Sequence, residues 1–323
     1  MTFQTIIARS PYRLTLSGGG SDLAKFSDKY GGALINFTAN KYMYVVIHKP
    51  FENVFRLRYS QTEEVESVNQ IKHELIREVL RFLNITEGLE ISTLSDISSR
   101  GTGLGSSSVL IVTLLSALHT YKGEYASPEQ LAKEAYIIEH DILKHSVGRQ
   151  DMWAAAYGGL RYYQFMQNGT VKATPIISNH EDKLKLKSHF MLLYTNIQRE
   201  AEPILKSMSQ VDNTSALLKR KELAELYYKD LLAGKWQATP KYMMAGEALK
   251  NSLAKGISNP KIDAMLVKIK KLGGVGKSIG SGGGGFLLIY ADPSKHELIK
   301  KKLKLKELEF EFESNGTQIL YVD

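Results

Sequence analysis

The sequence predicts an α+β protein built of two lobes. Its 323 residues exceed the roughly 250–300 at which a single hydrophobic core usually divides. Strand and helix patterns are mixed along the first half, and the C-terminal part reads as strand, strand, helix, strand, strand. That order is typical of a small antiparallel sheet packed on helices. The polar, lysine-rich segment Ser178 to Lys187 is the best candidate linker, so we expect lobes at residues 1–183 and 184–323.

The N-terminal residues predict the beginning of a sheet. Ile6 to Ala8 and Leu14 to Leu16 read as two short strand pieces. Leu23 to Tyr30 has helical spacing and stops at two glycines, which commonly end helices. The β-branched and aromatic stretch Ala33 to Lys49 predicts one or two strands. Further along, strands are expected at Phe55 to Tyr59 and Leu89 to Leu94, and a helix at Ile71 to Leu83.

The most informative stretch is Ser98 to Val109, with the sequence SSRGTGLGSSSV. Its glycines can adopt positive φ and let the backbone approach a ligand closely. The apolar residues that follow predict a buried helix from Ser106 to Tyr121. Unpaired N–H groups at the start of a helix favour a phosphate there. An ordinary surface turn of glycine and serine is the alternative reading of this stretch.

The segment after this helix carries further candidate residues. Ser127 and Pro128 predict the start of a helix that runs to about Lys144. The stretch His145 to Gly159 reads as a turn that carries Asp151. A hairpin of two strands follows, at Leu160 to Met166 and Val171 to Ile177.

Besides the block at Ser98 to Val109 and a first one at Ser17 to Asp22 (SGGGSD), a third glycine-rich block, GKSIGSGGGG, lies between two strand patterns. Gly276-Lys277-Ser278 resembles the end of a P-loop, but Lys271 stands where that motif requires its first glycine. A dinucleotide-binding fingerprint is also excluded, because a strand and not a helix follows the glycines. The other expected elements are a helix at Ala201 to Leu232 with a break near Asn213, helices at Trp236 to Ala254, Pro260 to Leu272 and Ser294 to Leu305, and strands at His189 to Thr195, Leu308 to Glu313 and Gln318 to Val322.

Composition narrows the class of protein. The absence of cysteine excludes disulfides, thiol nucleophiles and thiolate metal sites. The first residues show no apolar leader, and the longest apolar run, Val109 to Leu118, is too short to span a membrane. The formal charge of +8 is mostly interspersed with acids, and the dense run Lys300 to Lys306 reads as a solvated helix face. We therefore expect a cytoplasmic protein that binds neither nucleic acid nor membrane.

Three glycine-rich blocks in this order resemble the motifs of the GHMP small-molecule kinases. The first motif is matched by Pro11, Arg13, Gly18 and Asp22, the second by Gly103 to Ser107 with Ser99 in place of the usual proline, and the third by Ser281 to Gly285. The resemblance implies an N-terminal lobe like domain 2 of ribosomal protein S5 and a ferredoxin-like C-terminal lobe, the α/β plait. It also implies that ATP and a sugar bind in the cleft between the lobes.

Within that superfamily, the chain looks most like the sugar-1-kinases acting on D-glycero-D-manno-heptose 7-phosphate. Gly19 and Gly20 stand where galactokinases have glutamate and histidine. The resemblance implies transfer of the γ-phosphoryl group of ATP to the C1 hydroxyl, giving the 1,7-bisphosphate for nucleotide-activated heptose synthesis. A kinase for an unphosphorylated sugar of the galactose or fucose type, or an inactive sugar-binding regulator of the same fold, are the alternatives. A homodimer is left open.

The resemblance also implies roles for individual residues. Asp151 would accept the proton of the sugar hydroxyl, with Arg13 beside it to keep the carboxylate ionised and to neutralise the transferred phosphoryl group. Mg²⁺ would be bound by Ser107 and Glu139. The ATP phosphates would be held by Gly101, Thr102, Gly103, Leu104, Gly105, Ser106, Ser107 and Ser108. The sugar would be bound by Gly18, Gly19, Gly20, Ser21, Asp22, Gly282 and Gly283.

Each of these residue types also has an ordinary structural role. Asp151 could form a turn, Glu139 could be an exposed helix acid, and Asp22 could cap the helix that follows it. The five-residue spacing of His140 and His145 does not suit a helical metal site. Three arginines are candidates for a substrate 7-phosphate, namely Arg149, Arg161 and Arg199.

Overall fold

A large mixed sheet forms the centre of the computed structural model, which describes residues 4–97, 103–176, 179–198, 206–207, 212–253 and 257–323. Its strands follow the order β13-β1-β2-β5-β3-β4, and β12, β6 and β7 pair along the rest of β2 and β6. Among the described strands, only β3 and β5 pair in parallel. The strands are β1 (Thr5–Ser17), β2 (Gly32–His48), β3 (Phe55–Arg58), β4 (Thr62–Val65), β5 (Glu90–Ser95), β6 (Arg161–Phe165), β7 (Val171–Pro175), β12 (Phe312–Glu313) and β13 (Gln318–Val322).

The first strand is continuous, where the sequence predicted two pieces. β1 pairs with β2 along its whole length, and the register shifts between Pro11 and Tyr12. A proline lacks the N–H that a ladder needs, and a local bulge accommodates this loss without ending the strand. β2 is likewise one strand, long enough to pair with β5 at its C-terminal end and with β6 at its N-terminal end.

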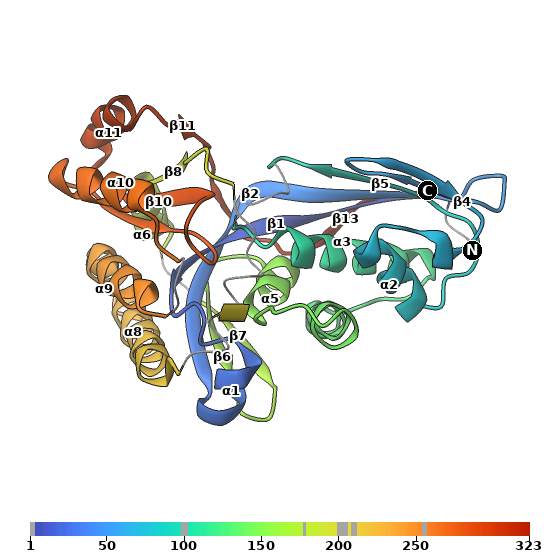
Figure 1. Cartoon of the computed structure of the whole chain (residues 1–323), viewed down its shortest axis with the longest axis horizontal. Coiled ribbons are helices and arrows are strands. Elements are labelled where there is room, and N and C mark those ends of the chain that lie inside the picture. Colours follow the sequence, from blue (N-terminus) through green and yellow to red (C-terminus); the bar gives the residue numbers. More distant parts are fainter. Residues whose placement is uncertain (1–3, 98–102, 177–178, 199–205, 208–211, 254–256) are drawn as a thin grey trace.

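Helices α2, α3 and α5 cover one face of this sheet (Figure 1). The buried helix α3 (Ser106–Tyr121) has the predicted bounds. Ser127 accepts a hydrogen bond from the N–H of Gln130 at the start of α4, which confirms the predicted cap. The predicted continuation of α4 is a π-helical segment, η2. The elements are α1 (Ala24–Tyr30), η1 (Val68–Gln70), α2 (Glu74–Phe82), α4 (Pro128–Tyr136), η2 (Ile137–Ile142) and α5 (Gln150–Tyr157).

The predicted turn around Asp151 is wrong, because Asp151 lies in the first turn of α5. This helix buries Met152 to Ala156 against the sheet. Alanine favours helix, and the burial of one apolar face supplies the stability that so short a helix lacks alone. The chain leaves the helix at Gly158, whose φ is +62°. The catalytic candidate is therefore held by a packed helix.

The second lobe is built on a four-stranded antiparallel sheet with the order β11-β8-β10-β9. Figure 1 shows α8, α9, α10 and α11 gathered around this sheet. The strand–loop–strand reading of the third glycine block is confirmed by β9 and β10. The elements are β8 (Phe190–Tyr194), α8 (Thr214–Leu232), η3 (Trp236–Ala238), α9 (Thr239–Asn251), α10 (Pro260–Lys271), β9 (Val275–Ser278), β10 (Phe286–Tyr290), η4 (Pro293–Lys295), α11 (His296–Leu303) and β11 (Lys306–Glu307).

The predicted linker segment forms a helix, α6 (His180–Ser188), which connects β7 of the large sheet to β8 of the small sheet. Its cap residue Asn179 accepts a hydrogen bond from the N–H of Asp182. One prediction about the tail is wrong. The tail strands expected in the C-terminal lobe pair elsewhere, β12 with β2 and β13 with β1. β13 thereby covers an edge of the large sheet that would otherwise expose unpaired backbone groups.

One hydrophobic core joins the two lobes, and a separate cluster packs within the second lobe. Phe37 on β2 packs against Phe190 of the small sheet, with ring centroids 5.6 Å apart. It also contacts Phe310 and Phe312 of the returning tail, at 5.7 and 4.5 Å. Aromatic pairs at such distances bury large apolar areas and fix the relative placement of the elements that carry them. Within the described residues, no helix is long and apolar enough to cross a membrane.

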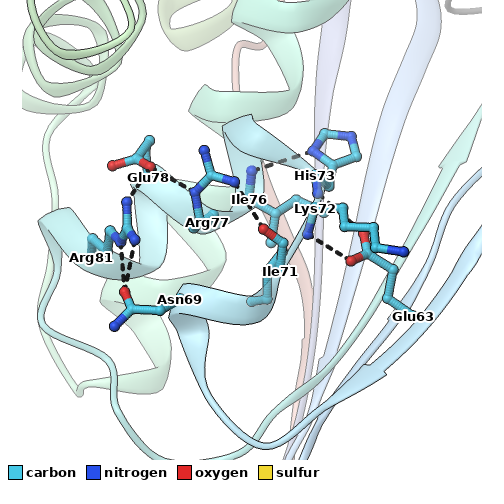
Figure 2. A network of polar contacts seen from close by, with 9 residues as sticks. All are labelled: Glu63, Asn69, Ile71, Lys72, His73, Ile76, Arg77, Glu78 and Arg81. Carbon is cyan, nitrogen blue, oxygen red and sulfur yellow. Dashed lines mark hydrogen bonds and ion pairs between the residues drawn. The ribbon is translucent and has the colours of Figure 1, made fainter.

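A polar network at the outer end of the sheet holds β4 against α2 (Figure 2). The Glu63 carboxylate accepts hydrogen bonds from the backbone N–H groups of Lys72 and His73, at 2.7 and 3.1 Å. Glu78 accepts from Arg77 and Arg81 at 2.9 and 2.7 Å. These contacts satisfy the buried carboxylates and fix the start of α2, so we assign the network a structural role.

A buried histidine on α3 makes folding stability depend on pH. His119 contacts Glu134 at 2.7 Å and Glu124 at 2.9 Å. The contact with Glu134 is the largest effect and raises the pKa of His119 above its usual value. Burial lowers this pKa, and Glu124 raises it again. Since the folded pKa is raised, the stabilisation is complete below the unfolded pKa of about 6.5 and is lost as pH rises through the folded pKa.

We therefore expect the melting temperature to fall as the pH is raised from about 6.5 through the folded pKa of His119. The Glu134→Gln variant should show a weaker fall, because the largest cause of the shift is removed. Thermal unfolding followed by circular dichroism at a series of pH values measures this. Glu129→Gln on the same helix is the control, since Glu129 pairs only with the exposed Lys133. An identical pH slope in all three proteins would contradict the prediction.

Candidate active site

The second and third glycine blocks touch each other directly. Gly103 and Gly280 have φ values of +76° and +66°. A Cβ added to Gly103 would lie 2.8 Å from the carbonyl oxygen of Ile279, and one added to Gly280 would lie 2.4 Å from that of Gly103. Neither approach is open to a residue with a side chain. The fold thus brings together two sequence blocks that the motif analysis had singled out separately.

Arg13 and Asp151 form an ion pair at this junction. Arg13 Nε lies 2.7 Å from Asp151 Oδ1, and the side chains are 5% and 19% exposed. Arg13 also donates from Nη1 to the carbonyl oxygen of Gly103 at 2.8 Å. The predicted position of Arg13 beside Asp151 is confirmed. A charge-assisted pair with little water around it holds the carboxylate in one orientation.

The start of α3 lies against the same carboxylate. Gly105 precedes α3 with a φ of +77°. A Cβ on Gly105 would lie 2.4 Å from Asp151 Oδ2, so only glycine permits this approach. The unpaired N–H groups of the first helical turn therefore lie next to Asp151. A phosphate at that helix end would be adjacent to a proton acceptor.

Ser107 and Glu139 also meet. Ser107 Oγ donates to Glu139 Oε1 at 2.5 Å, and Ser108 Oγ donates to Oε2 at 2.6 Å. Glu139 is only 1% exposed, so the alternative of an exposed helix acid is wrong. Burial raises the pKa of Glu139, and the two serine hydroxyls act in the opposite direction. The π-helical segment η2 presents this carboxylate to the first turn of α3.

This donor set fits Mg²⁺. A hydroxyl and a carboxylate are hard oxygen ligands, and Mg²⁺ binds through few protein oxygens while keeping several waters. A buried carboxylate that accepts hydrogen bonds from two hydroxyls also gains from a cation. Among the described residues no group of three or more histidine, aspartate or glutamate side chains forms a separate metal cluster. His140 instead bonds Asp141, and His145 faces Glu74.

The first glycine block forms a tight loop after β1. Gly18 has a φ of +85°, and a Cβ there would lie 2.1 Å from the carbonyl oxygen of Ala33. Ser21 Oγ donates to the carbonyl oxygens of Gly18 and Ala33. The loop backbone is therefore fixed against β2, and Gly19 and Gly20 lie at its tip.

Asp22 connects this loop to the helix that carries Asp151. Its Oδ1 accepts from the N–H of Gly20 at 2.9 Å, and its Oδ2 accepts from the N–H of Gln150 at 3.2 Å. Burial, followed by the nearby Asp151, raises the pKa of Asp22. The alternative of a helix cap is wrong, because Leu23 is the cap residue of α1 and no side chain caps it.

The remaining predicted residues contact other parts of the chain or lie outside the described residues. Gly282 lies against the carbonyl oxygen of Ile257, and the carbonyl oxygen of Gly283 accepts from Asn259. Two of the arginine candidates have local partners: Arg149 bonds Ser27 and Asp28, and Arg161 bonds backbone carbonyl oxygens. Outside the described residues lie Gly101, Thr102 and Arg199.

Sequence reasoning missed two side chains near the loop. Thr15 Oγ1 donates to Gln150 Oε1 at 2.7 Å, beneath Gly19. No motif points to them, although Gln150 directly precedes Asp151. Their contact joins β1 to the start of α5, so the first glycine block and Asp151 are held as one unit.

Comparison with known proteins finds similarity to one kinase family. Residues 69–159 match the family model of the GHMP kinases N terminal domain. The chain is 27% identical to D-glycero-alpha-D-manno-heptose 7-phosphate kinase of Campylobacter jejuni, over 98% of each chain. Residues 69–159 thus form a GHMP kinase N-terminal domain, and the chain as a whole is similar to a sugar kinase. GHMP kinases are ATP-dependent phosphotransferases, which agrees with a phosphate loop at the start of α3.

Solved structures agree with the fold described above. A D-glycero-D-manno-heptose 1-phosphate kinase from Bacteroides thetaiotaomicron superposes with a TM-score of 0.80, at 24% identity and covering 98% of this chain and 99% of that one. Phosphomevalonate kinase of Streptococcus pneumoniae, in complex with phosphomevalonate and AMPPNP, gives a TM-score of 0.79 at 16% identity, covering 95% and 99%. The predicted two-lobed α+β kinase fold is confirmed.

Proposed function

We propose that this protein is a GHMP kinase that transfers the γ-phosphoryl group of ATP to the C1 hydroxyl of D-glycero-D-manno-heptose 7-phosphate. The observation that carries the proposal is the Arg13–Asp151 pair at the meeting point of Gly103 and Gly105. The 27% identical heptose 7-phosphate kinase, alike over 98% of each chain, supports the choice of sugar. Both substrates are soluble metabolites, which is consistent with a cytoplasmic enzyme.

Each group at the site has a role in this reaction. The N–H groups at the start of α3 bind the ATP phosphates, and Asp151 accepts the proton of the attacking C1 hydroxyl. Arg13 offsets charge on the phosphoryl oxygens and keeps Asp151 ionised, at some cost in basicity. Ser107 and Glu139 would hold Mg²⁺, which neutralises charge between the β- and γ-phosphates when bound. Positioning and charge supply most of the catalysis in such transfers.

The sugar is expected at the loop of Gly18 to Ser21, whose backbone lies between β1 and α5. Asp22 holds that loop to Gln150, next to the proton acceptor. Direct contact of Asp22, Gly282 or Gly283 with the sugar stays a prediction. The cleft between the lobes and the boundary at residue 183 are likewise part of the proposal.

The proposed function is tested by ADP release with a panel of acceptors. The panel contains D-glycero-D-manno-heptose 7-phosphate, the free heptose, galactose, fucose and mevalonate. We expect the highest kcat/KM with the heptose 7-phosphate. A preference for an unphosphorylated sugar would replace this substrate, and no turnover with any acceptor would favour a sugar-binding regulator of the same fold.

The metal site is tested by Ser107→Ala. We expect the Mg²⁺ concentration for half-maximal activity to rise by about tenfold, because one oxygen ligand and one carboxylate partner are lost. Titration of MgCl₂ at fixed ATP measures this. Ser116→Ala makes the same change further along α3 and should leave the titration unchanged. An unaltered Mg²⁺ requirement in Ser107→Ala would remove this residue from the site.

A further inference from the structure

A lysine of the third glycine block reaches from the second lobe to β1. Lys277, on β9, donates from Nζ to the carbonyl oxygens of Thr15 and Leu16, at 2.7 and 2.8 Å. The residue is only 5% exposed. These carbonyls lie near the end of β1, just before the loop that starts at Gly18, and Arg13 lies on the same strand. The contact therefore joins the second lobe to the segment that carries both the loop and the Asp151 partner.

An arginine of α8 makes a second contact of the same kind. Arg220 donates from Nε to the carbonyl oxygen of Gly19 at 2.7 Å, and from Nη1 to that of Gly246 at 2.5 Å. It is 5% exposed, and burial lowers its pKa to about 10. One guanidinium thus fixes the tip of the loop to helix α9. Planar donors in a fixed fork hold such a geometry closely.

The backbone of β9 next to Lys277 is itself held by hydrogen bonds. The neighbouring Ser278 donates its N–H and Oγ to Glu247 Oε1, at 3.1 and 2.7 Å. Lys250 donates to the Ser278 carbonyl oxygen at 2.8 Å. Burial, followed by Lys250, lowers the pKa of Lys277 to about 7. A neutral amine still has two N–H donors, so both carbonyl contacts persist whichever form is present.

Stability alone does not account for these cations. Burying a charged group is costly, and apolar residues of similar volume often stabilise a protein as well or better. Both cations end on backbone carbonyls of one segment, residues 15–19, and neither has a carboxylate within ion-pair distance among the described residues. The contacts therefore specify where that segment lies relative to the second lobe.

We propose that Lys277 and Arg220 are positioning residues for the sugar: from the second lobe they hold residues 15–19 and so set where the acceptor lies relative to Asp151. Neither touches the reacting atoms. This inference rests on the proposed function, because it assigns the loop at Gly18 to Gly20 to the acceptor. The proposal assigns sugar binding to residues 15–19 and their two partners in the second lobe, and ATP binding to the start of α3.

The test compares Lys277→Met with Lys268→Met by steady-state kinetics. Methionine keeps an unbranched chain without N–H donors. We expect KM for heptose 7-phosphate to rise about tenfold or more, since two contacts from an amine are lost, while KM for ATP changes less than about twofold. Lys268 also donates to a backbone carbonyl, that of Lys302 at 2.6 Å, but far from the loop and exposed. Its variant should behave as wild type.

A second measurement separates positioning from folding. Because the chain has no cysteine, Lys277→Cys can be alkylated with 2-bromoethylamine in denaturant and refolded, which restores an amine at this site alone. We expect the sugar KM to return toward the wild-type value on alkylation. Should Lys277→Met fail to fold, Arg220→Lys, which keeps the charge but loses the fork, carries the kinetic comparison.

The outcomes are distinguishable. Equal changes in both KM values, no change in either, or no recovery on alkylation would overturn the positioning role while leaving the kinase intact. Absence of wild-type turnover with every acceptor would instead overturn the proposed function. A selective rise in sugar KM that alkylation reverses supports the inference.

Discussion

Replacing Asp151 by asparagine is expected to lower kcat by about 10³-fold, within the range that general-base catalysis contributes. The amide cannot accept the proton of the sugar hydroxyl, and it leaves Arg13 without the carboxylate that it contacts at 2.7 Å. Nucleotide binding should be retained, because the phosphate loop and the Ser107–Glu139 contact are untouched. ADP release measures turnover, and isothermal titration calorimetry measures ATP binding.

The matched control is Asp230→Asn. Asp230 has a similar exposure, 26% against 19% for Asp151, and accepts a hydrogen bond from Tyr242 in the second lobe. Its variant should keep wild-type turnover. Full activity of Asp151→Asn would show that this carboxylate is not the proton acceptor. Loss of ATP binding along with turnover would indicate a damaged fold, which circular dichroism of the variant would reveal.

Local patterns predicted most elements because burial and periodicity determine them residue by residue. α3 is apolar nearly all round, and its bounds could be predicted from the sequence. The failures have different causes. The linker was predicted, but its helix α6 was not, because this lysine-rich segment has no apolar stripe and buries only Leu186. α5 is short and lies between glycines. The pairing of β13 with β1 joins the two ends of the chain, and no local pattern specifies such a partner.

The site also contains residues that the sequence predicted and residues that only the structure reveals. The resemblance to the GHMP kinases predicted Arg13, Ser107, Glu139 and Asp151, and the fold brings them into two contacting pairs. Their side chains carry the chemistry, so the pattern of a kinase family marks them. Lys277 and Arg220 bond backbone carbonyls, which every residue has, so the sequence holds no sign of their partners. Side chains that act on the backbone are found only once the fold is known.

Gly105→Ala is expected to lower kcat/KM by about 10²-fold or more. The added Cβ would lie 2.4 Å from Asp151 Oδ2, so the carboxylate or the loop must move, and a displacement of about 1 Å at a reacting centre costs a factor of this size. The positive φ of +77° adds a stability loss of about 1–2 kcal/mol. Kinetics and thermal unfolding measured together separate the two effects.

The variant Gly123→Ala measures how much stability is lost through the positive φ alone. Gly123 also has a positive φ, +74°, but no atom lies within 4 Å of its added Cβ. Both variants should therefore lose similar stability, while only Gly105→Ala loses activity. Equal activity in the two would mean that the close approach of the phosphate loop to Asp151 is not needed for transfer. A loss of activity in Gly105→Ala alone would show that catalysis requires the close approach of the start of α3 to Asp151, which a side-chain methyl group prevents.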